Sequence, residues 1–166
     1  MEHNQEMRKQ HDHFVDQKKM MGYKKLLLMI AISFFTMYAV MFLNVDDASH
    51  IFLSISRTYM ALLMSLPMAV VMIAMMNKMY PSKKMNITIV VGAVILFGII
   101  LAALRSQTPV GDVQYMKAMI PHHSSAIMTS RNATITDPEV KKLSLEIIES
   151  QERETAQMKA ILSRMK

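Results

Sequence analysis

The residues of this chain that are best suited to chemistry are methionines and histidines that lie close together in its C-terminal part. Met116 and Met119 are three positions apart, and the pair His122 and His123 follows directly after Pro121. A thioether is a soft, uncharged ligand that suits Cu(I), and imidazole also binds copper. This spacing therefore predicts a Cu(I) site, with Ag(I) as an alternative occupant. Zn(II), bound by the two histidines and a carboxylate of a neighbouring helix, is a further alternative.

Methionine is abundant throughout the chain and cysteine is absent. Of the 166 residues, 20 are methionine, and one apolar segment carries a ladder of them spaced four apart: Met60, Met64, Met68 and Met72. A spacing of four places these side chains on one slowly drifting stripe of a helix. Two interpretations stay open. The ladder is either adaptable packing around the kink that Pro67 introduces, or a path along which copper crosses a membrane.

Three segments are apolar and lack Asp, Glu, Lys, Arg and His: residues 26–43, 59–76 and 87–104. At about 1.5 Å of rise per residue, a helix of this length nearly crosses a hydrocarbon core of roughly 30 Å. We therefore predict a three-helix transmembrane domain at 26–104, after a polar tail at 1–25 and before an outer domain at 105–166. A long polar stretch precedes the first segment and no small-residue cleavage site follows it, so we expect a retained anchor.

The positive charges predict how these helices are oriented. The tail at 1–25 is rich in Lys and Arg, and the loop after the second segment carries three lysines: Lys78, Lys83 and Lys84. The loop after the first segment carries Arg57 as its one Lys or Arg. Cytoplasmic loops hold the excess of positive charge, so we expect a cytoplasmic N-terminus in a bacterial inner or plasma membrane. Residues 105–166 then lie in the periplasm or outside the cell, where methionine is a ligand that cannot form disulfides.

Several function classes are disfavoured by the sequence. The apolar segments contain no ionisable residue, which argues against a proton-driven transporter. The chain has no phosphate-binding glycine loop, and no serine or threonine has a base and orienting partner defined by sequence. We therefore expect a protein that is not an enzyme. The net charge of +6 is partly a topology signal, and no basic stripe with interleaved aromatics predicts a nucleic-acid partner.

The polar tail contains a second, looser group of metal-binding residue types. His3, Met7 and His11 are four apart, and His13 lies close by. If the tail is helical, they share one face. A weak metal-binding face and a solvated charged tail are both compatible with this pattern.

Residues 105–166 predict an antiparallel helical hairpin. The first helix should run from about Asp112 to Arg131. The second has a clear start, because Asp137 is a favourable N-cap and Pro138 suits the first helical position. The short connection predicts antiparallel neighbours. A turn near residue 134 would place His123 opposite about Glu146.

The second hairpin helix has a core stripe that is interrupted by polar residues. The stripe alternates spacings of three and four, as in a coiled coil: Ser144, Ile148, Gln151, Thr155, Met158, Leu162 and Met165. Its middle is Gln151 and Thr155, with Glu154 beside them. Polar groups inside a core cost stability unless they are satisfied, and such exceptions are common at functional sites.

The run from Met116 to Met128, followed by Asp137-Pro138-Glu139 and the run from Ile147 to Met158, resembles the domain-of-unknown-function family 305. This family includes the CopM-like periplasmic copper-binding proteins. The resemblance covers about residues 110–163 and implies a ferritin-like helical bundle that binds Cu(I). The site residues that it implies are the ligands Met116, Met119, His122, His123 and Met158, supported by Gln151 and Glu154.

Many relatives carry more helices or a second copy of this unit, whereas this chain has one hairpin. A single hairpin buries little core. We therefore expect a homodimer or higher homo-oligomer that completes a four-helix bundle with the methionine and polar layer inside.

The ladder is similar to the Met-x-x-x-Met pair in the second membrane helix of Ctr-type copper-uptake proteins. Met60 and Met64 match that pair. The predicted orientation is opposite, however, and Gly92 and Gly98 are six apart instead of forming Gly-x-x-x-Gly. The analogy leaves conduction open as an alternative.

Together these features predict a membrane-anchored, extracytoplasmic Cu(I)-binding protein that sequesters copper or hands it over. A copper pump or an oxidase is a candidate recipient, and the lipid bilayer is the first partner. The alternatives are a copper-conducting membrane protein that uses the ladder, and a structural interaction module without metal.

Overall fold

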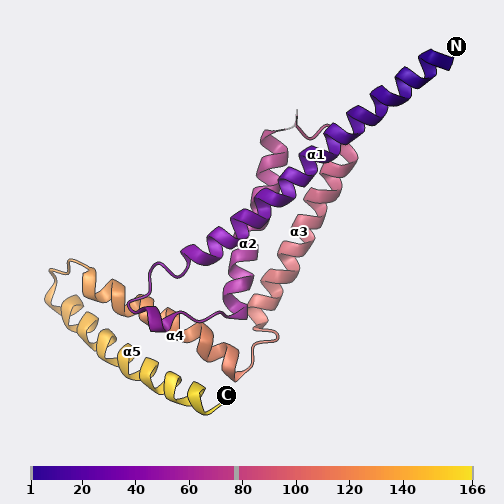
Figure 1. Ribbon diagram of the computed structural model, residues 1–166. Helices are drawn as coiled ribbons and strands as arrows, with labels where there is room; N and C mark the ends of the chain where they lie inside the picture. The colour runs from indigo at the N-terminus through magenta and orange to yellow at the C-terminus, as the bar shows by residue number, and fades with distance from the viewer. Residues whose placement is uncertain (1, 77–78, 166) are drawn as a thin grey trace. The chain divides into compact units, whose positions relative to one another are not determined.

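The computed structural model describes residues 2–76 and 79–165, and every regular element in these ranges is helical (Figure 1). The elements are α1 (Glu2–Val40), the 3-10 helix η1 (Ala48–His50), α2 (Ile55–Met75), α3 (Lys83–Ser106), α4 (Asp112–Asn132) and α5 (Pro138–Arg164). The predicted all-α architecture, with three long apolar helices followed by a hairpin, is confirmed for these residues. Lys78, which contributes to the predicted charge pattern, lies outside the described residues.

Three helical segments are long and apolar enough to cross a membrane: Met20–Val40, Ile55–Met75 and Lys83–Ser106. The first of them belongs to a longer helix, because α1 begins at Glu2 and continues without interruption. The polar tail and the first apolar segment therefore form one helix. The sequence permits this because residues 2–40 contain no proline, the residue that most strongly breaks a helix.

The chain forms two compact units, each assembled from two stretches of sequence. The first contains the residues up to Met37 together with Ala61–Ala102. In this unit the Tyr23 hydroxyl donates a hydrogen bond to Asn86 Oδ1 at 2.8 Å, and Asn86 Nδ2 donates to the Tyr80 carbonyl at 2.7 Å. A Cβ at Gly22 would lie 2.9 Å from a backbone carbonyl oxygen. The close approach of α1 to the backbone of Met79 therefore requires glycine at position 22.

The second unit contains Tyr38–Met60 and Ala103–Lys166, and its centre is the pair of helices α4 and α5 (Figure 1). Its core cluster consists of Met116, Ile120 and Leu162, and four partly buried side chains pack against them: Phe52, Val113, Met158 and Ile161. The predicted start of α5 is confirmed. Asp137 is the N-cap and accepts hydrogen bonds from the backbone N–H groups of Glu139 and Val140, and Pro138 opens the helix.

The register of the hairpin differs from the prediction. His123 contacts Glu154, not the region of Glu146, and the Ser144 hydroxyl donates to the carbonyl of Ser130 at 3.3 Å. The connection is the reason, because Ala133 at its start and Asp137 at its end both have extended backbone. The chain therefore runs past the end of α4 before α5 begins. The prediction assumed a symmetrical turn at residue 134 and did not include these extended residues.

Candidate metal-binding site

His123 is held in a defined orientation inside the second unit. The residue is buried, with 7% of its surface exposed. Its Nδ1 lies 2.9 Å from the carbonyl oxygen of Met119, one helical turn earlier on α4. A carbonyl oxygen only accepts hydrogen bonds, so Nδ1 carries the proton and donates it. A metal-binding histidine usually donates its other ring N–H to a carbonyl or carboxylate in this way, which fixes the orientation of the ring.

The other ring nitrogen of His123 faces a carboxylate. Nε2 lies 2.9 Å from Glu154 Oε2, which belongs to α5 and has a side chain 48% exposed. Ionised Glu154 only accepts hydrogen bonds, so in a hydrogen bond between the two groups Nε2 is the donor. Deprotonated Nε2 is also the ring atom that can bind a soft cation, because the Met119 contact occupies Nδ1. Glu154, predicted as a supporting residue, is thus the direct partner of His123.

The predicted methionine ligands belong to both helices of the hairpin. Met116 is buried in the core cluster, and the half-buried Met158 packs against that cluster. Met158 is also one turn after Glu154 on α5, and the half-buried Met119 is one turn before His123 on α4. Each helix therefore has a methionine one helical turn along the chain from its member of the His123–Glu154 pair. The structure places Gln151 half-buried on the same stripe of α5.

The polar interruption in the core stripe is present in the structure. Thr155 is 3% exposed, and none of the described residues offers its Oγ1 a hydrogen-bond partner. An unsatisfied buried hydroxyl costs about 1–3 kcal/mol. The interface between α4 and α5 therefore contains an unfavourable buried hydroxyl, on the residue next to Glu154.

His122 differs from its neighbour. It is exposed, and its ring centroid lies 6.2 Å from that of His123 with the planes 76° apart. The structure therefore does not bring His122 into the His123–Glu154 contact. Of the carboxylates that could complete a zinc site, Glu152 is bound to Arg131. Among the residues whose side chains the structure describes, no three His, Asp or Glu side chains converge closely enough to hold a metal ion.

A segment that sequence reasoning missed holds α4 in place from the side. The backbone N–H of Asp46 donates to the Ser124 hydroxyl at 2.8 Å, and His50 Nδ1 lies 2.9 Å from the same oxygen. Arg131 bridges Asp46, at 2.6 Å, and Glu152. Ser124 directly follows His123, so these contacts anchor the helix next to the histidines. No local pattern in the sequence signals them, because the partners are more than 70 positions apart.

The same segment borders a charged cavity of about 370 Å³ on the side of α5 opposite Glu154. Its wall includes His50, Arg131, Glu152 and Lys159. Burial and, to a smaller extent, the charge of Lys159 lower the pKa of His50, while hydrogen bonds from Ser49 lower the pKa of the Asp47 carboxyl. His50 therefore stays neutral to lower pH than an exposed histidine.

The methionine ladder lies beside the packing face of α2, not on it. The buried residues of α2 are spaced four apart and are mostly small: Ala61, Ser65, Ala69 and Ile73. Each ladder methionine precedes one of them by one position. Met60 is 41% exposed, and Met64, Met68 and Met72 are half-buried. Met72 packs against the core of the first unit. Small residues let membrane helices approach closely, so packing in α2 does not depend on methionine.

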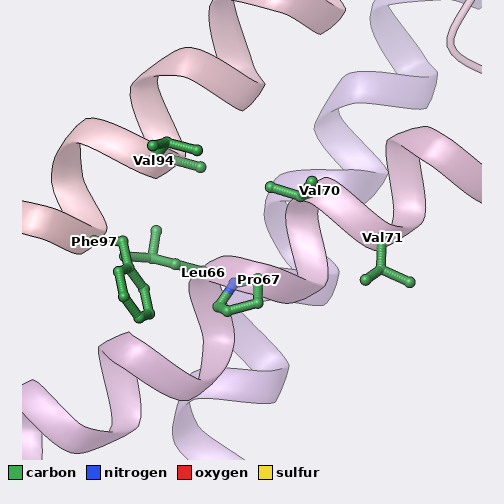
Figure 2. Close-up of a pocket in the computed structure, with 7 residues that line it drawn as sticks. Leu66, Pro67, Val70, Val71, Val94 and Phe97 are labelled. Carbon is green, nitrogen blue, oxygen red and sulfur yellow. The ribbon is translucent and has the colours of Figure 1, made fainter.

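An apolar cavity of about 330 Å³ lies beside Pro67 between α2 and α3 (Figure 2). Leu66, Val70, Val94 and Phe97 contribute to its wall. None of the residues that line it is a methionine. The ladder and this cavity therefore belong to different faces of α2.

Comparison with known proteins identifies the family. The profile of a domain of unknown function, DUF305, matches residues 99–162. An uncharacterized protein of Acanthamoeba polyphaga mimivirus is 36% identical over 150 residues, which cover 88% of this chain and 96% of that protein. The chain belongs to the DUF305 family. No solved structure matches it.

The resemblance predicted from the Met–His segment is thus confirmed. The DUF305 domain begins within α3 and contains α4 and most of α5, so it includes every candidate ligand from Met116 to Met158. The ladder on α2 lies outside the domain. The similarity to the viral protein extends over much more of the chain than the DUF305 domain itself.

Proposed function

We propose that this DUF305 protein is a membrane-anchored Cu(I)-binding protein whose hairpin sequesters copper or hands it over. The observation that carries the proposal is the orientation of His123. Its Nδ1 proton is fixed by the Met119 carbonyl at 2.9 Å, and its Nε2 is directed at Glu154 in a layer that also contains thioethers. Imidazole and thioether together form a soft donor set that suits Cu(I) and Ag(I).

In this proposal the residues have distinct roles. His123 Nε2 is the fixed ligand, and the sulfur atoms of Met119 and Met158 are the adjustable ones, because a thioether on three rotatable bonds reorients easily. Met116 supplies a further sulfur from the core. Glu154 holds the imidazole in place while the site is empty and remains as a nearby negative charge when a cation is bound.

His122 has the position expected of an entry or transfer ligand. It is exposed beside the buried His123, with 6.2 Å between the ring centroids. A ligand on the surface of the hairpin is suited to take up copper and to share it with another chain. A copper pump or an oxidase in the same membrane is the class of recipient that we propose.

The three candidate spans support a membrane anchor. We propose that the N-terminus is cytoplasmic and that the hairpin lies outside the cytoplasm, as the distribution of Lys and Arg favours. The protein acts by binding, without a catalysed reaction. Of the ladder, Met72 contributes to packing, because it contacts the core of the first unit.

The direct test is Cu(I) competition on the full chain in nanodiscs, with a colorimetric Cu(I) chelator as the competitor. His123→Ala combined with Met119→Leu should weaken Cu(I) binding at least tenfold. The Met119→Leu change conserves volume and costs less than about 1.5 kcal/mol, and circular dichroism checks that the double variant keeps its helices. The matched control is Met128→Leu, because Met128 is a half-buried methionine on α4 outside the proposed ligand set. Unchanged affinity in the double variant would show that the site is misassigned.

The proposed topology has its own test. A reporter enzyme that is active only outside the cytoplasm, fused after Lys166, should be active. A cytoplasmic result would contradict both the orientation and the argument that methionine replaces cysteine for reasons of compartment.

A further inference from the structure

One face of the hairpin remains uncovered in the single chain, and the candidate ligands lie on it. We define this open face by side chains spaced three, four or seven apart on each helix: Tyr115, Met119 and His122 on α4, and Val140, Leu143, Ile147, Glu154, Met158, Ile161 and Met165 on α5. Several large apolar side chains on it are about half exposed: Tyr115 at 54%, Val140 at 50%, Leu143 at 55% and Met165 at 43%. A continuous apolar patch of this kind normally marks an interaction site.

The opposite side of the hairpin is already occupied. There the segment around Asp46 and His50 is bonded to Ser124 and Arg131 of α4, and Lys159 of α5 donates to the Ser49 hydroxyl at 2.9 Å. The chain thus covers one side of the hairpin with its own residues and leaves the other side apolar.

The composition of the open face is that of a helix-bundle interior. Glu154 is its one acidic or basic residue, and it is engaged by His123. The other flank of α5 carries Glu149, Glu152 and Lys159. An amphipathic helix buries its apolar flank against another helix, and two antiparallel helices with an apolar face between them are half of a four-helix bundle.

The size of the face fits a stable dimer. α5 contains 27 residues, so at about 1.5 Å per residue it is about 40 Å long. Two helices of about 10 Å diameter side by side give a face roughly 20 Å wide. The product is about 800 Å² on each chain, which equals the contribution of one partner to an interface of standard size.

On one chain the structure shows a single side-chain contact at the candidate metal site. His123 and Glu154 meet, but His122 is exposed, and among the described residues no third histidine or carboxylate joins the pair. Met119, His122 and Met158 lie on the open face, at the height of this contact or within about a turn of it. A two-fold axis through the face would bring the same residues of a second copy to the same layer, because a symmetric dimer uses one patch on both chains.

We propose that a second copy of this chain packs its own open face against this one, and that the partner's Met119, His122 or Met158 completes the copper coordination started by His123. This inference rests on the proposed function. It goes further in naming the partner and in placing the metal at an interface between chains. Copper binding and dimerisation are then coupled, since a metal that binds only the dimer stabilises it by mass action.

The first experiment uses Leu143→Glu in the full chain in nanodiscs. Leu143 is exposed in the single chain, so a charge there leaves the monomer intact, whereas it is buried without a partner in the proposed dimer. We expect Cu(I) affinity to fall at least tenfold, although no proposed ligand is altered. Leu145→Glu is the matched control. Leu145 is 60% exposed on the same helix but points about 200° away, so its substitution should leave affinity unchanged.

The second experiment uses the absence of cysteine, which allows a single introduced thiol to report on contact between chains. Metal-free full chain in membranes, carrying Ile147→Cys near the middle of the open face, should be cross-linked to a dimer by a short bis-maleimide. The same reagent should leave Leu145→Cys as a monomer.

The outcomes separate the two proposals. If Leu143→Glu binds Cu(I) as tightly as wild type, or if Ile147→Cys fails to cross-link, the shared site is wrong while the proposed function stands. If the Ile147→Cys variant cross-links but the wild type does not bind Cu(I), the proposed function is wrong and the shared site with it. Loss of affinity in Leu143→Glu together with selective cross-linking supports both.

Discussion

The buried hydroxyl of Thr155 provides a quantitative test of the packing between α4 and α5. Thr155 is 3% exposed, and no described residue accepts or donates a hydrogen bond at its Oγ1. Valine has nearly the same shape but no hydroxyl. Because an unsatisfied buried hydroxyl costs about 1–3 kcal/mol, Thr155→Val should stabilise the second unit by about that amount.

Hydrogen–deuterium exchange on the full chain in nanodiscs measures this change where it occurs. Amides in α5 around position 155 exchange through local opening of the hairpin. A stabilisation of about 1–3 kcal/mol should slow their exchange by about 5- to 150-fold. Amides in α1 should be unaffected, because that helix belongs to the other unit up to Met37.

Two further variants make the result interpretable. Thr129→Val alters an exposed threonine on α4 and should change exchange little, since surface substitutions act within about 0.5 kcal/mol. Thr155→Ala also removes the hydroxyl but leaves a cavity, so it should be less stable than Thr155→Val. Equal or faster exchange in Thr155→Val than in wild type would refute the reasoning, because it would mean that the hydroxyl is satisfied in the folded protein.

Three more predictions concern other parts of the chain. Gly22→Ala should lower the thermal midpoint of the full chain, since its Cβ would lie 2.9 Å from the Met79 carbonyl oxygen and overpacking costs about 1–3 kcal/mol; Gly98→Ala, with open space around its Cβ, should not lower it. Asp137→Ala should speed amide exchange in the first turn of α5, because a lost N-cap costs about 1 kcal/mol. Burial lowers the pKa of His50, so the unfolded chain takes up a proton near pH 6.5 before the folded one does. Stability contributed by neutral His50 is therefore present above about pH 6.5 and decreases as the pH falls, and His50→Gln should reduce that pH dependence in denaturant titrations.

Local sequence patterns predicted the helices well. Asp137 and Pro138 mark the start of α5 because N-caps and first-turn prolines act through their immediate neighbours. The apolar segments predicted three long helices because their length and composition are properties of the segment itself. The polar tail was not predicted to be helical. No proline or capping signal between residues 2 and 25 strongly favours or prevents a helix there.

The burial of some candidate ligands was predicted from the sequence, but the contacts around them were not. Met116, His123 and Met158 are placed between the hairpin helices as expected, because their periodicity matches the core stripe. The contact of His123 with Glu154 could not be predicted, since it depends on how far the extended connection carries the chain past α4. The contacts of Asp46 and His50 with Ser124 depend on the tertiary fold, and nothing in the local sequence encodes them.

The contribution of residues 44–52 to the hairpin has a consequence for how the protein can be made and divided. Phe52 packs against the Met116 cluster and Asp46 binds Arg131, yet both precede the stretch that matches DUF305. During synthesis this segment leaves the ribosome before α2, α3 and the hairpin. It can pack against the hairpin only after both hydrophobic helices have been made. A fragment that starts at the DUF305 boundary lacks residues 44–52 and exposes part of the Met116 cluster to water. The smallest fragment that keeps all of these contacts of the hairpin therefore starts before the second hydrophobic helix, not after the third.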